Sequence, residues 1–393
     1  MSGGLPESGP GRSAQRLSIL YVLAYPRSGT TVLGNLLGEL DGYFHAGEVT
    51  YLWAPDLVAP RRRCGCGNAL DECQVWHDVY ASAFPEAFSP RTAARPVSVD
   101  GDGHQRPDTS LPTISHAFVP SVATPMSRMR GDLIGRRAYG RTLLRRSATK
   151  GDLARYRQSL AKLYHGMAAV TGAQVIVDSS KLLQDAEIVA GVPGIDVRIL
   201  HVVRDGRGVA LSRMRRMSPL RPDGTRQMSK RRLTLEAARW TMSNAAMEFR
   251  LSRLECPSMV LRYEAFVADP KTTIRQIAGF AGKPVSDFGF LHATDEGWAA
   301  SVGLNHTSGG NRNRWTRGTV ALTEDVRWTS ELGPADRRLA SLATWGGRAR
   351  YGYTGRPQRL LAGRRHRLQA TTPTRSISSI GSHPDAGAAR QDA

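Results

Sequence analysis

The chain has 393 residues, of which 40% are apolar, so it is long enough for one large domain or two modest ones. Its formal net charge of +20 attracts polyanions in general, namely nucleic acid, an anionic membrane surface or an acidic substrate, and does not choose among them. Four cysteines in a chain of this length argue against a disulfide framework, and no run approaches the roughly 18 apolar residues of a membrane span. A basic n-region followed by an apolar stretch is not visible either. We therefore expect a cytoplasmic protein without a transmembrane segment, and leave a peripheral membrane contact open.

The elements expected along the chain alternate between strands and helices. Residues 1–16 are small and polar and are expected to form a disordered tail. The nearly continuous apolar run at 17–24 predicts a strand buried on both faces, and a turn separates it from a helical pattern at 32–40. The same patterns predict helices at 152–171, 181–190, 205–217, 235–254 and 274–280 and strands at 174–177, 197–203 and 258–261. This alternation predicts an α/β fold in which helices cover both faces of a parallel β-sheet.

Three stretches fall outside this alternation. Residues 84–150 are rich in Pro, Arg, Ser and Thr with weak periodicity, which is typical of a lid or a binding segment. Residues 218–232 look like a basic linker, and 355–393 like a second disordered tail. Part of the positive charge lies in that tail and in Arg61–Arg63, where a solvated basic face is the simplest explanation. We expect one domain over 17–354, with a variable insert at 84–150.

The turn after the first strand predicts an anion site. In Tyr25-Pro-Arg-Ser-Gly-Thr-Thr31, a tight turn containing glycine points backbone N–H groups at one spot in front of a helix N-terminus. That arrangement suits a phosphate or a sulfate. The side chains that could add donors are those of Arg27, Ser28, Thr30 and Thr31. The alternative is an ordinary turn whose hydroxyls cap the helix.

A nucleotide-dependent kinase is the nearest alternative for this turn. A nucleotide triphosphatase loop needs Gly-x-x-x-x-Gly-Lys-Ser/Thr, whose lysine reaches the outer phosphates. Aligned on Gly29, this chain has Ala24 in place of the first glycine and Thr30 in place of the lysine. The missing cation argues against phosphoryl transfer.

Two further polar segments follow predicted strands. Arg204 ends one strand, and Ser212 lies eight residues later, about two helical turns on, so the pair could grip one phosphate. Either residue alone is more often a solvated side chain. Asp178-Ser-Ser-Lys181 follows another strand, where ligands bind in sheets of this type, so Lys181 could face the same ligand. A helix N-cap by Ser179 or Ser180 is an equally good interpretation of that segment.

These segments, in this order, resemble the sulfotransferase family over roughly residues 17–330, interrupted by the 84–150 insert. The resemblance implies a P-loop NTPase-like three-layer sandwich and 3′-phosphoadenosine 5′-phosphosulfate as sulfuryl donor. The 5′-phosphate and the sulfuryl group would then be held by Arg27, Ser28, Gly29, Thr30 and Thr31. Arg204 and Ser212 resemble the family's 3′-phosphate site. Tyr263 is similar to the tyrosine that contacts adenine, although a core tyrosine is nearly as good an explanation.

The resemblance also implies the catalytic groups. Glu48, which follows a glycine, would take the proton of the acceptor hydroxyl, a role worth roughly 10²–10⁴ in rate. His45 is the alternative base. Arg27, Lys181 and the amides of the turn would stabilise the sulfuryl oxygens during an in-line displacement that requires no metal. Carbohydrate, lipid headgroup, phenol and peptide tyrosine all remain open as acceptors, with their selection expected in 42–150 and 218–232.

A cationic, glycine-containing loop lies near the C-terminus, from His306 to Gly318. The resemblance implies that such a loop covers the 3′-phosphate. Asn311 and Arg312 match the form found in bacterial members, and Arg317 is the rival arginine.

A non-catalytic polyanion-binding protein is the remaining alternative, because the net charge alone would support it. Binding to nucleic acid predicts basic residues interleaved with stacking aromatics. Aromatic residues make up only 7% of the chain and form no such pattern, so we expect no nucleic-acid partner.

Cys64, Cys66, Cys73 and His77 are close in sequence and offer metal-ligating atoms. Their spacing is not that of two Cys-x-x-Cys pairs, so buried thiols or a local disulfide are the favoured interpretation. We therefore expect no metal.

Overall fold

The computed structural model describes residues 16–53, 62–87, 98–99, 105–106, 122–138, 150–217 and 230–354. The two expected tails (except Arg16), most of the expected linker at 218–232 and much of the 84–150 insert lie outside the described residues.

A five-stranded parallel sheet forms the centre of the molecule. Its strands lie in the order β2 (Tyr43–Gly47), β5 (Val175–Lys181), β1 (Ser18–Ala24), β6 (Asp196–Val203) and β7 (Ser258–Arg262). The four strands predicted from apolar runs correspond to β1, β5, β6 and β7, so the predicted parallel α/β sheet is confirmed. The edge strand β2 was not predicted, because its five residues mix aromatic, polar and small side chains.

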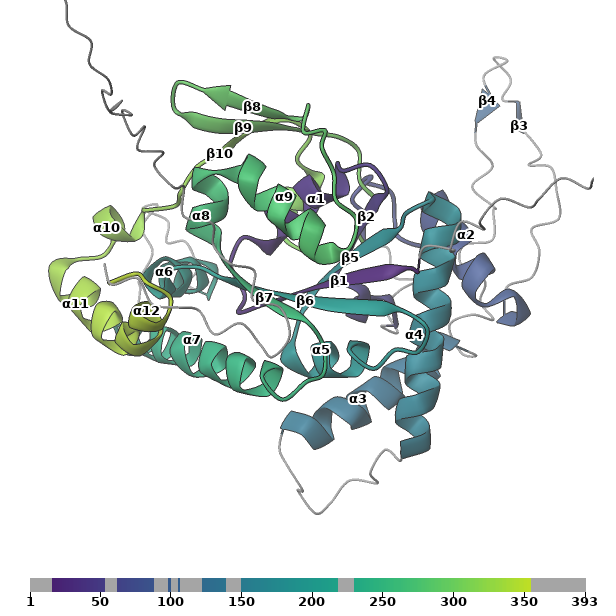
Figure 1. The fold of residues 1–393 in the computed structure, drawn as a ribbon, viewed down its shortest axis with the longest axis horizontal. Coiled ribbons are helices and arrows are strands. Elements are labelled where there is room, and N and C mark those ends of the chain that lie inside the picture. Colours follow the sequence, from purple (N-terminus) through teal and green to yellow (C-terminus); the bar gives the residue numbers. More distant parts are fainter. Residues whose placement is uncertain are drawn as a thin grey trace, which may run out of the picture.

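Helices cover both faces of this sheet (Figure 1). Successive side chains of β1 alternate between two cores, Ile19, Tyr21 and Leu23 in one and Leu20, Val22 and Ala24 in the other. The first core is closed by α2 (Gln74–Ala83), α3 (Thr124–Ala138), α4 (Lys150–Thr171) and α5 (Leu183–Val189). The second is closed by α1 (Thr30–Gly38), α8 (Tyr263–Ala268) and α9 (Pro270–Ala281). The chain is therefore a three-layer sandwich.

The helix predictions agree with the structure, with one correction. Predicted helices at 152–171, 205–217, 235–254 and 274–280 correspond to α4, α6 (Gly206–Met217), α7 (Lys230–Leu251) and α9. The helix predicted at 181–190 begins later, at Leu183, because β5 continues through Lys181. Ser179 and Ser180 are therefore buried strand residues, and the N-cap position belongs to Leu182.

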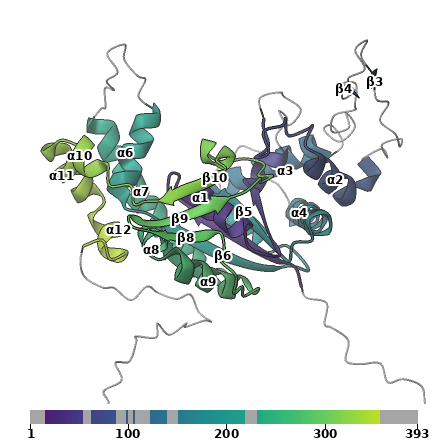
Figure 2. The same cartoon turned by 90° about the horizontal axis from the view of Figure 1, so that it is seen from above.

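The remaining elements were not predicted. After α9 come an antiparallel sheet of β8 (Leu291–Thr294), β9 (Gly297–Val302) and β10 (Gly318–Leu322), and then α10 (Trp328–Glu331), α11 (Pro334–Ala343) and α12 (Trp345–Arg350). Short pieces are η1 (Val49–Trp53), η3 (Pro85–Ala87), η5 (Arg312–Trp315) and the pair β3 (Ser98–Val99) and β4 (Gln105–Arg106). A separate small core joins α6, α7 and α11 at the end of the molecule away from α2 and α3 (Figure 2).

None of the helices in the described part of the chain is long and apolar enough to span a lipid bilayer.

Candidate active site

A polar cavity of about 700 Å³ opens at the carboxyl edge of the parallel sheet, where the loops after β1, β2, β5 and β6 converge. The predicted site residues that line it are Arg27, Gly29, Thr30, Thr31, Glu48, Lys181, Arg204, Ser212, Tyr263 and Asn311. These residues come from segments that are far apart in sequence. Ser28 and Arg312 are described but do not belong to the lining.

The turn between β1 and α1 requires a glycine at position 29. Gly29 is the N-cap of α1, with φ of 84°, a region that other residues adopt only at a cost. A Cβ atom there would lie 2.1 Å from Cε2 of Tyr263, so the ring packs directly on the main chain. The hydroxyl of Ser28 donates to the carbonyl of Tyr25 at 2.7 Å, within the turn, and the side chain is buried. Ser28 therefore stabilises the turn and does not offer its side chain to the cavity.

Two other cavity residues have strained backbones. Arg27 (φ 79°) and Lys181 (φ 73°) are the non-glycine residues with positive φ in the described part of the chain. Neither can form its own local hydrogen bond as Asn or Asp would, and such a conformation costs about 1–2 kcal/mol per residue. Strain of this kind concentrates at functional sites, where surrounding structure enforces it.

The two predicted anion-binding segments meet in this cavity. Nε of Arg27 donates to Oγ of Ser212 at 2.9 Å, and Nη1 of Arg204 donates to the carbonyl oxygen of Arg27 at 3.3 Å. The Arg204 guanidinium lies 5.2 Å from the centre of the Tyr263 ring and pairs with Asp325, Nη2 to Oδ2, at 2.8 Å. Segments more than 170 residues apart thus form one group of donors.

The cavity has a large excess of positive charge. Its lining contains nine lysines and arginines but only two carboxylates, those of Glu48 and Asp325. Burial lowers the pKa of Arg27, and the nearby guanidinium groups, with Arg216 and Arg204 the strongest, lower it further. Cations crowded in this way are stabilised by an anionic ligand.

Several of these cations were missed in the sequence. The missed lining residues are Arg62, Arg63, Arg213, Arg216 and Arg327, whereas Arg314 belongs to the cationic loop expected from the sequence. Arg62 and Arg63 were attributed to a solvated face; Arg63 is indeed exposed, but both residues also line the cavity. Arg216 lies four residues after Ser212 on α6, so the helical spacing after a predicted anion-binding serine was a usable signal for this arginine.

Glu48 and Lys181 form an ion pair in the cavity wall. Glu48 comes directly after β2 and Lys181 ends the neighbouring strand β5, so parallel pairing brings the two residues to the same edge. Both side chains are largely buried, at 14% and 15% exposure. Gly309 packs against Glu48, since a Cβ on this glycine would lie 3.2 Å from that of Glu48.

His45, the alternative base, is not placed to act on a ligand. Its Nδ1 lies 3.1 Å from Oδ1 of Asn35, and its Nε2 lies 3.1 Å from Oγ of Ser179. The ring is buried outside the cavity lining. Burial, with a smaller contribution from Lys181, lowers the pKa of His45 to about 3. The residue is a neutral structural link between α1 and β5.

The C-terminal cationic loop lines the cavity with the expected Asn311 and with an arginine other than Arg312 or Arg317. The backbone N–H of Asn311 donates to Oγ1 of Thr31 at 3.4 Å, which brings the loop to the start of α1. Arg312 is exposed at the start of η5, and Arg317 donates to the carbonyl of Cys66 at 2.8 Å. Arg314, two residues into η5, lies against the ring of Trp315 and lines the cavity. The turn of η5 therefore brings Arg314, and neither Arg312 nor Arg317, to the site.

Comparison with known proteins identifies the family of the chain. The sequence model of the sulfotransferase family matches residues 20–287. Among solved structures, the chain is similar to the sulfotransferase domain of the curacin biosynthetic pathway, with a TM-score of 0.39 and 16% identity over 83% of this chain and 97% of that one. It is also similar to the sulfotransferase domain of the Synechococcus PCC 7002 olefin synthase, with a TM-score of 0.40 and 16% identity over 86% and 98% of the two chains. A search of curated proteins gave no match. Because the family match covers more than half of its length, the chain belongs to the sulfotransferase family and is a transferase.

Proposed function

We propose that this protein transfers the sulfuryl group of 3′-phosphoadenosine 5′-phosphosulfate to a hydroxyl group of an acceptor. The observation that carries the proposal is the meeting of Arg27, Ser212 and Arg204 in one strongly cationic cavity at the N-terminus of α1. A donor with phosphate groups at both ends of a nucleoside needs two linked anion sites, and the cationic groups of this cavity support that assignment.

The donor's 5′ end fits the N-terminus of α1. Gly29, Thr30 and Thr31 line the cavity there, where helix amides and the helix dipole favour an anion. Arg27 reaches from this end to Ser212, so it would neutralise the 5′-phosphosulfate while Ser212 contacts the 3′-phosphate.

The 3′-phosphate end would lie between Arg204 and Ser212, with the adenine near Tyr263. Arg327 is the arginine that we assign to cover this phosphate, because it pairs with Asp325 at 2.6 Å beside Arg204. The hydrogen bonds from Arg327, and then the contact with Arg204, hold the pKa of Asp325 well below its usual range. That carboxylate would orient the two guanidinium groups for the incoming phosphate.

The reaction is an in-line displacement at sulfur. The acceptor oxygen forms a bond to sulfur as the bond from sulfur to the bridging oxygen breaks, and its electron pair leaves with the 5′-phosphate of adenosine 3′,5′-bisphosphate. The acceptor proton passes to Glu48. Lys181, which pairs with Glu48 in the structure, can turn to the sulfuryl oxygens and release the carboxylate for that role. Carbohydrate, lipid headgroup and phenol hydroxyls all fit this chemistry.

Calorimetric titration with adenosine 3′,5′-bisphosphate tests the donor site. Arg27→Ala should weaken binding by roughly 10–100-fold, since a hydrogen bond to a charged group is worth about 1.5–3 kcal/mol. Ser212→Ala should weaken it by roughly 2–10-fold. Arg253→Ala is the matched control, because this exposed arginine precedes β7 at the opposite edge of the sheet. Binding of ATP with no binding of the bisphosphate would overturn the proposal in favour of a kinase.

A further inference from the structure

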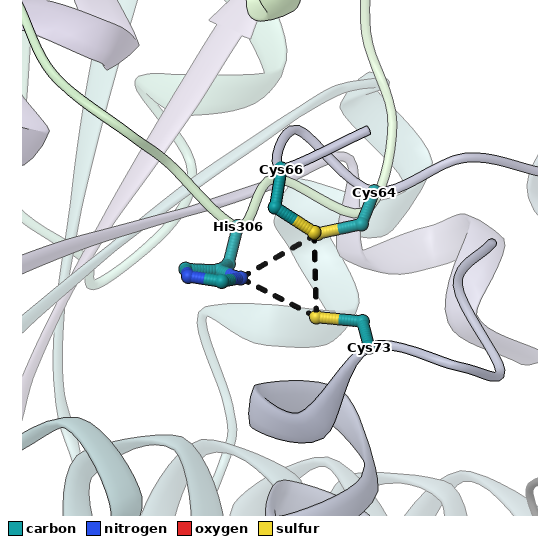
Figure 3. Close-up of side chains that lie close together, drawn as sticks. All are labelled: Cys64, Cys66, Cys73 and His306. Carbon is teal, nitrogen blue, oxygen red and sulfur yellow. Dashed lines mark hydrogen bonds between the residues drawn. The ribbon is translucent and has the colours of Figure 1, made fainter. Parts of the chain in front are cut away.

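Three cysteines and a histidine converge beside the active-site cavity (Figure 3). His77, the neighbour in sequence, instead contacts its own neighbour Asp78 at 3.2 Å. The histidine that approaches the cysteines is His306, whose Nδ1 lies 3.3 Å from Sγ of Cys73 and 3.8 Å from Sγ of Cys64. Sγ of Cys66 lies 3.9 Å from Sγ of Cys73.

These separations match a tetrahedral metal site. With bonds of about 2.3 Å to sulfur and about 2.0 Å to nitrogen, tetrahedral ligands lie about 3.8 Å apart for two sulfurs and about 3.5 Å apart for sulfur and nitrogen. All four ligand atoms lie within 4.8 Å of one another. A disulfide would need two sulfurs about 2.05 Å apart, and all four cysteines of the chain, each in the described part, are free thiols. Of the two interpretations favoured by the sequence, buried thiols or a local disulfide, the disulfide is therefore not formed.

The main chain around the cysteines is built to hold them in place. Residues 62–70 form a tight hairpin, in which the N–H of Leu70 donates to the carbonyl of Arg62 at 2.8 Å and the N–H of Cys64 to the carbonyl of Asn68 at 2.9 Å. Cys73 occupies the N-cap position of α2, where the helix dipole favours a thiolate.

The charge around the cluster also favours thiolate ligands. Three thiolates and one divalent cation leave a net negative charge, which neighbouring cations would stabilise. The guanidinium of Arg317 donates to the carbonyl of Cys66 at 2.8 Å, and that of Arg63 to the carbonyl of Gly67 at 3.0 Å.

We propose that Cys64, Cys66, Cys73 and His306 bind one Zn²⁺ ion as a structural site. Three sulfurs and one imidazole nitrogen form a donor set that suits zinc, and four protein ligands leave no open position for a substrate. The cavity lining contains none of these four described residues, which places the metal outside the reaction. Our expectation of no metal, drawn from the sequence, is replaced by this proposal.

The zinc site would fix the loop that carries Arg314. His306 begins the segment whose members Gly309, Gly310, Asn311 and Arg314 line the cavity. Hydrogen bonds already tie this segment to the cysteine hairpin, from the N–H of Gly65 to the carbonyl of Thr307 at 3.0 Å and from the indole of Trp315 to the carbonyl of Cys64 at 3.0 Å. A metal shared by both segments would join them covalently.

Metal analysis of the full-length protein, purified from zinc-supplemented medium without chelator, tests the site. We expect about one zinc per chain in the wild type. Cys73→Ser and His306→Ala should lower zinc affinity by more than about 10–100-fold, since loss of an outer partner of a ligand already costs that much. Cys256→Ser and His77→Ala are the matched controls and should retain zinc, because Cys256 is a half-buried thiol elsewhere and His77 faces Asp78.

Two results on the wild type keep the test independent of how the variants fold. Cobalt substituted for zinc should give the absorption spectrum of a tetrahedral thiolate site, and chelation should increase tryptic cleavage after Arg312, Arg314 and Arg317. A wild-type protein without zinc whose thiols all react freely in the native state would overturn the proposal. So would loss of zinc in His77→Ala with its retention in His306→Ala.

Discussion

Replacing Gly29 with alanine should destabilise the protein through two separate effects. At φ of 84° the left-handed backbone costs an L-residue about 1–2 kcal/mol. The new Cβ would also lie 2.1 Å and 2.3 Å from Cε2 and Cδ2 of Tyr263. To reach an ordinary contact the buried ring must move by about 1.5 Å, and overpacking of this kind costs about 1–3 kcal/mol. We expect the free energy of unfolding to fall by about 2–5 kcal/mol.

Urea denaturation of matched variants separates the two effects. In a Tyr263→Ala background the cost of Gly29→Ala should fall to the backbone part, about 1–2 kcal/mol. Gly279→Ala is the control: this exposed glycine lies in α9, no atom lies within 4 Å of the added Cβ, and alanine should stabilise the helix by about 0.5–1 kcal/mol. A Gly29→Ala variant as stable as the wild type, or one whose cost is unchanged without the Tyr263 ring, would refute this account of the turn.

Three further predictions concern the site and its support. Glu48→Gln should keep bisphosphate affinity but slow sulfuryl transfer to the best acceptor by roughly 10²–10⁴. The control Glu296→Gln, in the exposed turn between β8 and β9, should change neither the affinity nor the rate. Unchanged turnover by Glu48→Gln would remove Glu48 as the base. Lys181→Gly and Lys181→Ala should both lose sulfuryl transfer. In urea denaturation the glycine variant should have a free energy of unfolding about 1 kcal/mol higher than the alanine variant, because glycine tolerates φ of 73°. Equal free energies of unfolding for the two variants would argue against backbone strain at this position. Burial raises the pKa of Asp178 to about 6. Between about pH 4 and pH 6 the native state therefore binds more protons at this group than the unfolded chain does. The contribution of Asp178 to the free energy of unfolding should fall by roughly 2–3 kcal/mol as the pH rises through this range. Asp178→Asn should lack this fall, so the difference between the wild-type and variant free energies of unfolding should change with pH over this range. Parallel pH profiles of the two proteins would contradict this prediction.

The sequence was most informative where neighbouring residues alone determine the local structure. The segment from Tyr25 to Thr31 needs only a strand, a turn with glycine and a helix start, and all three are encoded by neighbouring residues. Arg204 and Ser212 could be paired for the same reason, because Arg204 follows the end of β6 and Ser212 lies on α6, which begins two residues later. The apolar run of β1 was equally plain, since a strand buried on both faces has no polar positions.

Which side chains distant segments bring to the cavity could not be predicted from neighbouring residues. Arg314 lies two residues after Arg312, and only the turn of η5 decides which of them faces the cavity. His306 reaches Cys73 across 233 residues of chain, whereas His77, four residues away, turns to Asp78. Proximity in sequence predicts contact within a helix or a hairpin. It gives no information once two loops from opposite ends of the domain meet.

The site is costly to the protein when no ligand is bound, and two independent observations support this. Arg27 and Lys181 hold strained backbones, and burial, followed by repulsion from the neighbouring guanidinium groups, lowers the pKa of Arg27. Packing of β1 and β5 offsets both unfavourable contributions, because the side chains of these strands are almost fully buried in the two cores. An anion in the cavity would relieve the repulsion and leave the strained geometry unchanged. Binding of the donor should therefore stabilise the fold as well as position the reacting atoms, because the cations are already in place before the ligand arrives.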